Sequence, residues 1–390
     1  MFQYKGEISA SKSLMNRALI VQSYEPKIEL FGSSDCSDVL YMKQALKEIS
    51  NKNIMDAGEG GTTFRFLVLR ASRLNQKTTI QAHPKLLSRP QQELIQIANQ
   101  LGVLIEIKNN SFVIQSSGWK PPKEELVVER GVSSQFLSGV MLNTWDLNFP
   151  LKIHWKGERR SEGYLRMTLE MLRHMGLIYI EKGEKIIVEP YQKPKIQAYR
   201  VESDVSSAFS VAAAGALFGR VELLNFPFKS LQPDIEFIKI LADMGVNLFQ
   251  KETSLVVEKA VNLKSIDVNL QNCPDLFPVL SVLCAQADGV SRLYGAPHLV
   301  HKESNRIELV SQLLRSVGVQ HQCHFDGMTI YGEKKLRNIN SEIYFNPAQD
   351  HRMAMAAGLF RLSGLPLNIQ TPEVVDKSFP EFWKILGLSL

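Results

Sequence analysis

The 390-residue sequence lacks the features that mark several protein classes. Its four cysteines form no CxxC pair and have no metal-ligand spacing to the eight histidines, so neither a disulfide scaffold nor a zinc site is indicated. The longest apolar runs, such as VAAAGALFG, are far too short to span a membrane. No basic block of the kind that follows nucleic acid occurs, although KGERRSEGY is locally rich in cations. These absences favour small anionic molecules as partners.

The chain also has no low-complexity tract, and its 44% hydrophobic and 22% charged residues are typical of a globular protein. The start, MFQYKGEISA, has no basic segment followed by an apolar one, so we expect a cytoplasmic protein with reduced, mostly buried thiols. A length of 390 residues is too great for one ordinary core and predicts two domains.

One pattern occurs four times: an amphipathic helix that ends in a hydrophobic residue and glycine, and then a short apolar strand. The glycines are Gly102, Gly176, Gly245 and Gly318, at intervals of 69 to 74 residues. Each fits the left-handed conformation that closes many helices. A turn and a second, alternating strand follow, as in KETSLVVE. A weaker copy, YMKQALKEISNKNI, lacks the closing glycine.

Six further segments predict helices that begin with polar residues and continue with small apolar ones. They are SASKSLMNRALIV, GEGGTTFRFLVL, GVSSQFLSGVML, SDVSSAFSVAAAGAL, CPDLFPVLSVLCA and QDHRMAMAAGLF. Their Ala, Ser and Gly content allows burial on all sides, because close backbone approach needs small side chains. Six such units, 50 to 75 residues apart, predict two domains of three repeats each.

The polar starts of these helices cannot be buried in the same cores. If three helices run parallel in each domain, their N-termini converge, and their N–H groups and dipoles there favour anions. Asp350 suits a helix N-cap, whereas Arg352 does not suit a helix N-terminus and predicts an anion as its partner. A solvated ion pair is the alternative explanation of Arg352.

Other cations occur at helix starts or in loops that contain Gly or Pro. They are Lys12, Arg17, Arg65, Arg89, Lys302, Arg306 and Lys377. Arginine can hold a phosphate or a carboxylate with two parallel hydrogen bonds. The interspersed acids Asp275, Glu303 and Asp350 suit general acid–base chemistry on an anionic substrate.

The order of these motifs resembles the 5-enolpyruvylshikimate-3-phosphate synthase (3-phosphoshikimate 1-carboxyvinyltransferase) family over essentially the whole chain. The motifs are SKSLMNRA, GTTFR, SSQFLSG, DVSSA, PDLFPVLSVL, KESNR, DHRMAM and KSFPEF, which are specific together and weak singly. The resemblance implies an α/β protein of two similar domains, 11–200 and 1–10 plus 201–390. Each would hold three repeats of a strand and helix unit with buried parallel helices, the inside-out α/β barrel of the enolpyruvyl transferase fold.

The family transfers the enolpyruvyl group of phosphoenolpyruvate to the 5-hydroxyl of shikimate 3-phosphate and releases phosphate, in the shikimate pathway. The resemblance therefore implies these two small molecules as partners, with no metal or organic cofactor, no nucleic acid, no membrane and a monomeric chain. Domain 11–200 would be the shikimate 3-phosphate side. The second domain would contribute the catalytic acids and the cations that bind phosphoenolpyruvate, and shikimate 3-phosphate would draw the domains together.

The resemblance also gives roles to the residues that match the family's motifs. Those implied to bind shikimate 3-phosphate are Lys12, Ser13, Arg17, Ser133, Ser134, Gln135, Ser161, Tyr164, Asp275 and Lys302. Those implied to bind phosphoenolpyruvate are Lys12, Gly61, Arg89, Gln135, Arg306, Arg352 and Lys377. Asp275 is the expected base for the attacking hydroxyl, and Glu303 or Lys377 the expected acid for the methylene carbon. Lys12 would stabilise charge and share that proton transfer.

Structural roles compete with some of these assignments. Ser133 and Ser134 could be a pair of helix caps, because Ser is a favoured cap. Asp204 could be a cap or a hinge contact, His351 could orient a neighbour, and Arg65 could brace the GEGGTT loop.

Some positions depart from the family's pattern. Glu59 stands where the glycine loop usually has Asn, which adds a negative charge near an anionic ligand unless the side chain points away. Asn305 replaces an acid in KESNR, and Gly163 replaces a Pro before Tyr164. None of these changes removes a charged catalytic group.

Three alternatives remain. UDP-N-acetylglucosamine 1-carboxyvinyltransferase shares the fold and the donor but uses a loop cysteine, and no cysteine lies between Cys36 and Cys273. RNA 3′-terminal phosphate cyclases need a nucleophilic histidine, and His351 lies in the wrong motif for one. A non-catalytic protein that binds phosphorylated metabolites would not need Asp275 and Glu303 among its cations.

Overall fold

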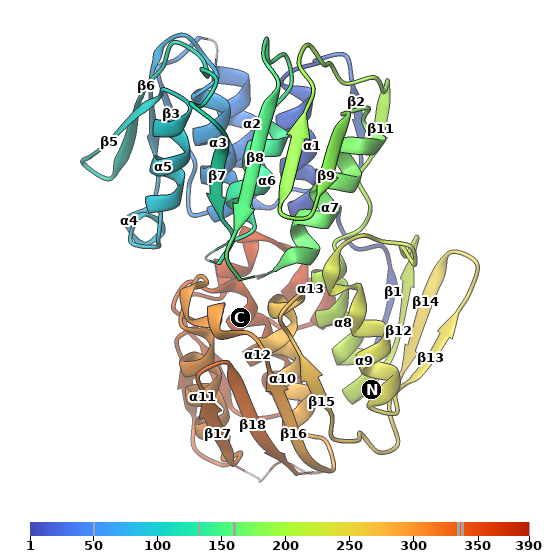
Figure 1. Ribbon diagram of the computed structural model, residues 1–390. Coiled ribbons are helices and arrows are strands. Elements are labelled where there is room, and N and C mark those ends of the chain that lie inside the picture. Colours follow the sequence, from blue (N-terminus) through green and yellow to red (C-terminus); the bar gives the residue numbers. More distant parts are fainter. Residues whose placement is uncertain (50, 132, 159–160, 334–335, 337–338, 390) are drawn as a thin grey trace. The chain divides into compact units, whose positions relative to one another are not determined.

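The protein is represented by a computed structural model that describes residues 1–49, 51–131, 133–158, 161–333, 336 and 339–389. It divides into two compact units (Figure 1). Unit 1 contains Met1–Ser9 and Glu202–Leu390, and unit 2 contains Ala10–Val201. Within the described residues, each unit has two four-stranded sheets and one two-stranded sheet.

Unit 2 has sheets of strand order β3-β4-β6-β5, β7-β8-β10-β9 and β11-β2. Its strands are β2 (Glu29–Phe31), β3 (Ile54–Asp56), β4 (Lys77–Gln81), β5 (Leu104–Lys108), β6 (Ser111–Gln115), β7 (Leu126–Glu129), β8 (Leu151–Lys156), β9 (Tyr179–Lys182), β10 (Lys185–Val188) and β11 (Ala198–Arg200). Its helices are α1 (Lys12–Gln22), α2 (Ser37–Glu48), α3 (Gly61–Ala71), α4 (Pro84–Leu87), α5 (Gln92–Gln100), α6 (Gln135–Leu142) and α7 (Glu162–His174).

Unit 1 repeats this arrangement with sheets of order β1-β12-β14-β13, β15-β16-β18-β17 and β19-β20. Its strands are β1 (Phe2–Gly6), β12 (Gly219–Leu224), β13 (Asn247–Gln250), β14 (Ser254–Glu258), β15 (Asp267–Asn269), β16 (Gly289–Tyr294), β17 (His321–His324), β18 (Gly327–Gly332), β19 (Ile343–Phe345) and β20 (Leu367–Ile369). Its α-helices are α8 (Val205–Phe218), α9 (Phe237–Asp243), α10 (Phe277–Ala285), α11 (Arg306–Ser316), α12 (His351–Leu362) and α13 (Phe382–Leu386). Its 3₁₀ helices are η1 (Pro233–Glu236), η2 (Pro274–Leu276), η3 (Pro297–His301) and η4 (Pro372–Lys377).

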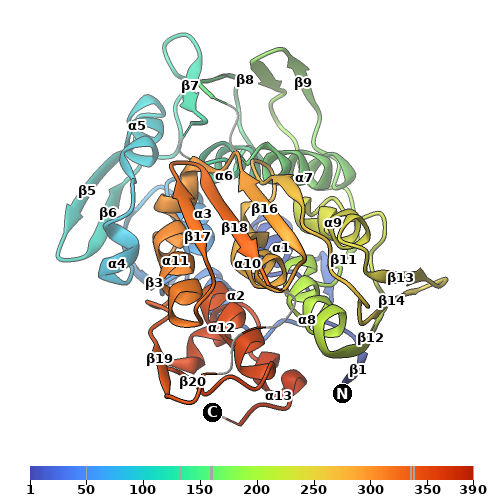
Figure 2. The same cartoon turned by 90° about the horizontal axis from the view of Figure 1, so that it is seen from below.

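Every four-stranded sheet is built the same way: its first two strands are parallel, and the other two join antiparallel as a hairpin. The N-terminal strand β1 follows this rule although its partner β12 is far away in the sequence, with Phe2 opposite Gly219. A Cβ atom at Gly219 would overlap the Phe2 carbonyl, so glycine is required where α8 turns directly into β12. The hairpin β13–β14 lies at the periphery of unit 1 (Figure 2).

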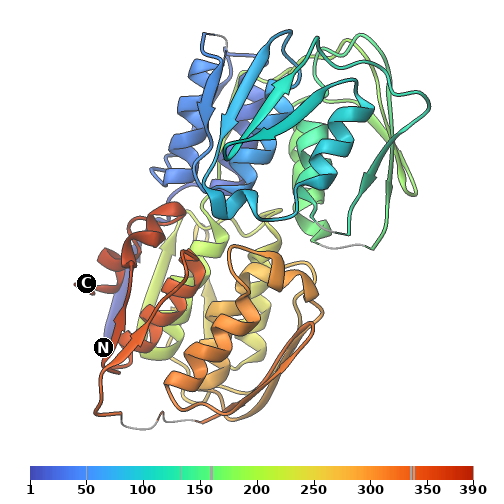
Figure 3. The same ribbon diagram turned by 90° about the vertical axis from the view of Figure 1, so that its left-hand side faces the viewer.

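Six helices form the cores of the two units, and they are the six segments predicted from the sequence. In unit 2 the helices α1, α3 and α6 pack on one another, and in unit 1 the helices α8, α10 and α12 do so. In Figure 3 the helices of each unit run alongside one another next to the strands. Small residues permit this packing: a Cβ at Gly139 of α6 would lie 2.7 Å from the Leu69 side chain of α3. Nearly every residue of α8 is buried, as its Ala and Ser content predicted.

The predicted helix-ending glycines and caps are confirmed. Gly102, Gly176, Gly245 and Gly318 all have positive φ, between 75° and 99°, and each stands between an outer helix and the first strand of a hairpin. Asp204 caps α8 by accepting a hydrogen bond from the Ser207 N–H at 2.8 Å. The weaker copy without a glycine forms helix α2, but the strand that follows, β3, pairs with β4 instead of forming a hairpin.

The structure also bears on the apolar segments and the cysteines of the sequence. No helix in the described ranges is long and apolar enough to cross a membrane. Cys36, Cys273 and Cys284 are buried free thiols, and Cys323 is an exposed one.

Gly245 offers a test of the helix-ending role, because a Cβ there would meet only ordinary contacts of 3.5 Å or more while φ is +81°. Gly245→Ala should therefore lower the free energy of unfolding by about 1 kcal/mol through backbone strain alone. Gly245→Asn should cost less, because Asn tolerates the left-handed region. Urea unfolding measures both, and equal costs for Ala and Asn would contradict this explanation.

Candidate active site

The N-terminal ends of α1 and α2 lie side by side in unit 2, next to the glycine loop that precedes α3. Lys12 is the first residue of α1, and its Nζ is 3.0 Å from the Asp38 Oδ2 at the start of α2. Asp38 also meets the glycine loop, since a Cβ at Gly60 would lie 2.7 Å from both its Oδ1 and the Thr63 Oγ1. Sequence reasoning missed Asp38, because nothing in SDVL distinguishes it from a solvated acid at a helix start.

Arg17 lies one turn further into α1 and is buried. Its Nε donates to the Thr168 Oγ1 at 2.7 Å, and its Nη1 donates to the Ser13 carbonyl at 2.7 Å. Burial lowers the pKa of Arg17 to about 10, and no acid among the described residues forms an ion pair with it. A buried cation held only by neutral groups is a suitable partner for an anion.

A second group gathers at the start of α3. A Cβ at Gly61, the first residue of α3, would lie 3.4 Å from the Arg89 Nη1 and 3.7 Å from the Gln135 Oε1. Gln135 begins α6, and its Nε2 donates to the Thr62 Oγ1 at 3.0 Å. Its Oε1 accepts a hydrogen bond from the Arg65 Nη1 at 2.7 Å. The structure therefore brings together Gly61, Arg89 and Gln135, which were predicted to bind one ligand.

The serines that were predicted to bind a phosphate lie at two more helix starts. The Ser133 Oγ accepts a hydrogen bond from the Gln135 N–H at 3.2 Å, so the cap interpretation holds for Ser133. It does not hold for Ser134, whose side chain makes no capping bond in α6. Ser161 precedes α7 with φ of +51°, which is uncommon for a residue with a Cβ. Tyr164 follows in the first turn of α7 and is half-buried.

Glu59, which departs from the family's pattern, lies near His83: the Glu59 Oε1 is 3.8 Å from the His83 Nε2. Both side chains are more than a third exposed, and the His83 Nδ1 accepts a hydrogen bond from the Lys85 N–H. The added negative charge of Glu59 thus has a histidine beside it in the structure.

In unit 1 the central group is the guanidinium of Arg306, the first residue of α11, which is 2% exposed. Its Nη1 donates to the Asp275 Oδ1 at 2.7 Å, and its Nε donates to the Asp350 Oδ2 at 2.9 Å. Asp350 is fully buried and caps α12, as predicted, by accepting a hydrogen bond from the Arg352 N–H at 3.0 Å. Asn305, which stands where the family usually has an acid, caps α11: its Oδ1 accepts a hydrogen bond from the Glu308 N–H.

Asp275 in η2 receives two further cations. The Arg352 Nη2 donates to the Asp275 Oδ2 at 2.9 Å, and the Lys302 Nζ lies 3.6 Å from the Oδ1. Burial raises the pKa of Asp275, but Arg352, Lys302 and Arg306 outweigh burial and hold it well below its usual range. Arg352 at the start of α12 thus forms an ion pair within the protein. The anionic ligand predicted for Arg352 stays a prediction.

Glu303 forms the second centre of unit 1. Its Oε2 is 2.7 Å from the His351 Nδ1, and its Oε1 is 3.5 Å from the Lys377 Nζ at the end of η4. His351 and Lys377 are both buried beside the Glu303 carboxylate. The orienting role of His351 stays a prediction. Arg306 joins Asp275 to Asp350, and side-chain atoms of Glu303, Asp350 and His351 lie within 4.8 Å of one another, so the two centres are neighbours.

Asp234 in η1 was not predicted to belong to this site. It is 1% exposed, and its Oδ2 accepts a hydrogen bond from the Ser206 Oγ in the first turn of α8. Burial, and then the charge of Asp275, raise the pKa of Asp234 to about 6, against the opposing charge of Arg352. Asp234 follows a proline in QPD, which resembles an ordinary turn, and this explains why sequence reasoning passed over it.

One group of side chains in unit 1 has metal-ligand geometry: oxygen or nitrogen atoms of Glu303, Asp350 and His351 lie within 4.8 Å of one another. Each of the two carboxylates already has a cation of the protein beside it, Lys377 for Glu303 and Arg306 for Asp350. Ion pairs within the chain therefore balance the negative charge of this group.

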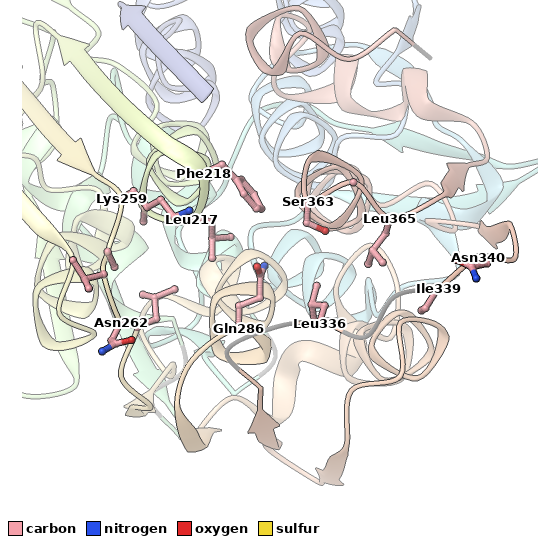
Figure 4. Close-up of a pocket in the computed structure, with 15 residues that line it drawn as sticks. Leu217, Phe218, Lys259, Asn262, Gln286, Leu336, Ile339, Asn340, Ser363 and Leu365 are labelled. Carbon is pink, nitrogen blue, oxygen red and sulfur yellow. The ribbon is translucent and has the colours of Figure 1, made fainter. Parts of the chain in front are cut away.

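A cavity of about 590 Å³ lies elsewhere in unit 1 (Figure 4). Phe218, Gln286 and Ser363 line it, and these residues stand at or just beyond the C-terminal ends of α8, α10 and α12. The charged cluster of unit 1 lies at the starts of the same helices, so this cavity is not part of the candidate site.

The Arg306 pairing predicts a cost for Asp350→Asn, which keeps the helix cap but removes the charge. Leaving a buried guanidinium without this carboxylate should lower the free energy of unfolding at pH 7 by about 3–5 kcal/mol. Burial raises the pKa of Asp350, but Arg306 lowers it further, so its net shift is downward. Its contribution is therefore present above the ordinary pKa of about 3.9 and disappears as pH falls through the lower folded value.

Urea unfolding at several pH values measures this difference. The matched control is Glu258→Gln, which breaks the exposed pair with Arg220 and should cost less than about 1 kcal/mol. A cost for Asp350→Asn no greater than that of the control at pH 7 would rule out the structural role of this ion pair.

Comparisons with known proteins bear on this arrangement. The family model described as EPSP synthase (3-phosphoshikimate 1-carboxyvinyltransferase) matches residues 37–386. A 3-phosphoshikimate 1-carboxyvinyltransferase of Clostridium novyi is 32% identical over 333 residues, which cover 85% of this chain and 75% of that protein. One of Methanococcus aeolicus is 30% identical over 433 residues, covering 97% of this chain and 95% of the relative.

Solved structures show the same fold. An EPSP synthase from Acinetobacter baumannii has a TM-score of 0.75 at 22% identity, covering 99% of this chain and 95% of that one. The enolpyruvyl transferase NikO from Streptomyces tendae has a TM-score of 0.72 at 12% identity, covering 99% of this chain and 94% of the other. The fold is therefore the α/β enolpyruvyl transferase fold, as the motifs predicted.

Proposed function

The chain belongs to the EPSP synthase (3-phosphoshikimate 1-carboxyvinyltransferase) family, and we propose that it transfers the enolpyruvyl group of phosphoenolpyruvate to the 5-hydroxyl of shikimate 3-phosphate, releasing phosphate. One observation carries the proposal. In unit 1, two separate carboxylates, Asp275 and Glu303, each contact cations that can instead hold an anionic substrate. This pairing supplies both a proton acceptor and a proton donor beside an anion site.

Unit 2, which corresponds to the predicted domain 11–200, binds shikimate 3-phosphate in this proposal. Arg17 offers a buried positive charge without a described acid partner, and Ser133, Ser134 and Ser161 offer hydroxyl groups at helix starts. Hydroxyl and guanidinium donors together satisfy a phosphate, because each of its oxygens accepts more than one hydrogen bond. Tyr164 would lie along the ring of the substrate.

Phosphoenolpyruvate carries a phosphate and a carboxylate, and both units supply cations for them in this proposal. Gly61, Arg89 and Gln135 of unit 2 converge on one point, where Gly61 leaves room because it has no side chain. In unit 1, the Arg306 guanidinium donates to the Asp275 Oδ1 and the Arg352 guanidinium donates to the Oδ2. The substrate carboxylate would take these guanidiniums in the bidentate manner that arginine favours.

This exchange of partners gives Asp275 its proposed role as a base. Without substrate, three cations hold the pKa of Asp275 well below its usual range, so the carboxylate is a weak proton acceptor. When the substrate carboxylate engages Arg306 and Arg352, Asp275 loses part of that stabilisation and its affinity for a proton rises. Asp275 would then accept the proton of the 5-hydroxyl as the hydroxyl oxygen bonds to the substrate's central carbon.

The methylene carbon must gain a proton in the same step, and we assign this to the Glu303 and Lys377 pair. His351 fixes the Glu303 carboxylate from the other side at 2.7 Å. The resulting tetrahedral intermediate then loses phosphate by cleavage of its carbon–oxygen bond, and the new methyl group returns a proton to the same pair. Lys12, held 3.0 Å from Asp38, would stabilise the charge of the leaving phosphate.

We also propose that the protein works as a monomer in the cytoplasm. The reaction uses two small metabolites, and the described residues of the two units supply every group that the proposed steps require.

The purified protein should release phosphate from phosphoenolpyruvate when shikimate 3-phosphate is present, and not with UDP-N-acetylglucosamine. Asp275→Ala and Lys12→Ala should each lower kcat by about a hundredfold or more, because each removes a group that acts in the transition state. Asp267→Ala and Lys43→Ala change exposed residues of the same types and should leave kcat unchanged.

Release of phosphate only with UDP-N-acetylglucosamine would replace the proposed acceptor. No release with either acceptor, in a folded protein that still binds shikimate 3-phosphate, would support the binding function and contradict the transferase.

A further inference from the structure

Arg65 is a buried cation of unit 2 that the proposed reaction does not use. It lies on the second turn of α3 and is 7% exposed. Its Nε donates to the Gln91 Oε1 at 3.1 Å, its Nη1 to the Gln135 Oε1 at 2.7 Å, and its Nη2 to the Pro90 carbonyl at 3.3 Å. The guanidinium also stacks on the Phe136 ring, with 4.7 Å between its central carbon and the ring centroid. All of these partners are electrically neutral.

The charge of Arg65 is therefore not balanced within the described part of unit 2, where no acid forms an ion pair with it or with Arg89. Burying an arginine without an ion-pair partner costs folding free energy unless an anion binds beside it. Burial, and then the nearby charge of Arg89, lower the pKa of Arg65 to about 9. The Arg89 Nε is itself a buried donor with no hydrogen-bond partner in the described residues.

The three acceptors of Arg65 connect it to the proposed phosphoenolpyruvate site. Gln135 is one of the residues that converge on Gly61. Pro90 follows Arg89 directly, so the bond to the Pro90 carbonyl anchors the loop that carries Arg89. Gln91 fixes the other end of the same turn by donating from its Nε2 to the Leu86 carbonyl. One guanidinium thus holds both the amide and the backbone that face the proposed ligand.

The planar fork of arginine explains why this residue type is suited to the position. The guanidinium directs three N–H groups to three separate acceptors, and the one on Nη1 bonds to the Gln135 Oε1 while the Gln135 Nε2 donates to Thr62. A lysine ammonium would keep the charge but could not hold these three acceptors in one plane.

We propose that Arg65 is a positioning residue for phosphoenolpyruvate: it orients Gln135 and the Arg89 loop around Gly61 and adds a positive charge beside them. The inference rests on the proposed function, because the ligand is the one assigned to that site. It gives Arg65 a role beyond bracing the glycine loop.

Arg70 provides a matched control on the same helix. It is also buried, its Nε donates to the Ser23 Oγ at 2.7 Å, and it stacks on the Tyr24 ring at 4.3 Å. It lies at the opposite end of α3, with no contact to Gly61, Arg89 or Gln135 among its hydrogen bonds. Arg65→Met and Arg70→Met therefore remove similar buried guanidiniums at two ends of one helix.

Steady-state kinetics of these variants test the proposal. Arg65→Met should raise the KM for phosphoenolpyruvate between about ten- and a hundredfold, as expected for lost hydrogen bonds to a charged group. The KM for shikimate 3-phosphate should rise less than about threefold, because the residues that Arg65 contacts belong to the proposed phosphoenolpyruvate site. Arg65→Lys should recover part of the loss, and Arg70→Met should leave both constants unchanged.

A double-mutant cycle with Gln135→Ala separates positioning from charge alone. If Arg65 acts through Gln135, Arg65→Met should raise the KM for phosphoenolpyruvate by a smaller factor when Gln135 is already absent. The full factor in both backgrounds would overturn the positioning role.

Two further results would overturn the proposal: an unchanged KM for phosphoenolpyruvate in folded Arg65→Met, or an equal rise for both substrates. Calorimetric titration of phosphoenolpyruvate into the same variants keeps the inference separate from the proposed reaction. If the wild-type protein binds phosphoenolpyruvate without turnover, the reaction fails while weaker binding by Arg65→Met still supports the inference. No binding by the wild-type protein would overturn both.

Discussion

Burial of arginine guanidiniums in or near the first turns of helices is the constraint on which the candidate site depends. Arg306 is almost fully buried and is neutralised by Asp275 and Asp350, whereas Arg17 and Arg65 are buried with neutral partners only. Burying a charge costs less free energy when the charge is paired, and the anionic ligands proposed to bind near Arg17 and Arg65 would supply the opposite charge. In the proposed function, a substrate carboxylate would replace Asp275 as the partner of cations in unit 1, and unit 2 would bind an anion.

The fold makes these positions available because helices, rather than sheets, form the buried centre of each unit. Core helices built of Ala, Ser and Gly can pack on one another within each unit, which leaves their polar first turns as the place where charged residues gather. The four-stranded sheet, with one parallel pair and one hairpin, occurs twice in each unit. Glycines with positive φ end the outer helices and lead the chain into the hairpin that follows each of them.

Much of this could be predicted from the sequence, because repeats, caps and helix-ending glycines are local features. Gly245 and Asp350 have the conformations that their neighbours in the sequence indicated. The partners of the charged residues could not be predicted in the same way. Asp38 meets Lys12, and Asp234 lies near Asp275, only because separate elements pack together, and neither acid has an unusual local sequence. The short parallel strands such as β3 and β15 were missed because three residues carry too little periodicity.

The proposed mechanism depends most on the Glu303 and Lys377 pair, which would add a proton to the methylene carbon and later remove one. The most direct test is to run the reaction in deuterium oxide and to follow the methylene group of the product by proton NMR. The account predicts deuterium in that methylene group, because the transient methyl group can lose any of its hydrogens. It also predicts slower deuterium incorporation in Glu303→Gln. A product formed at the normal rate without deuterium would contradict the addition and elimination that these residues are proposed to carry out.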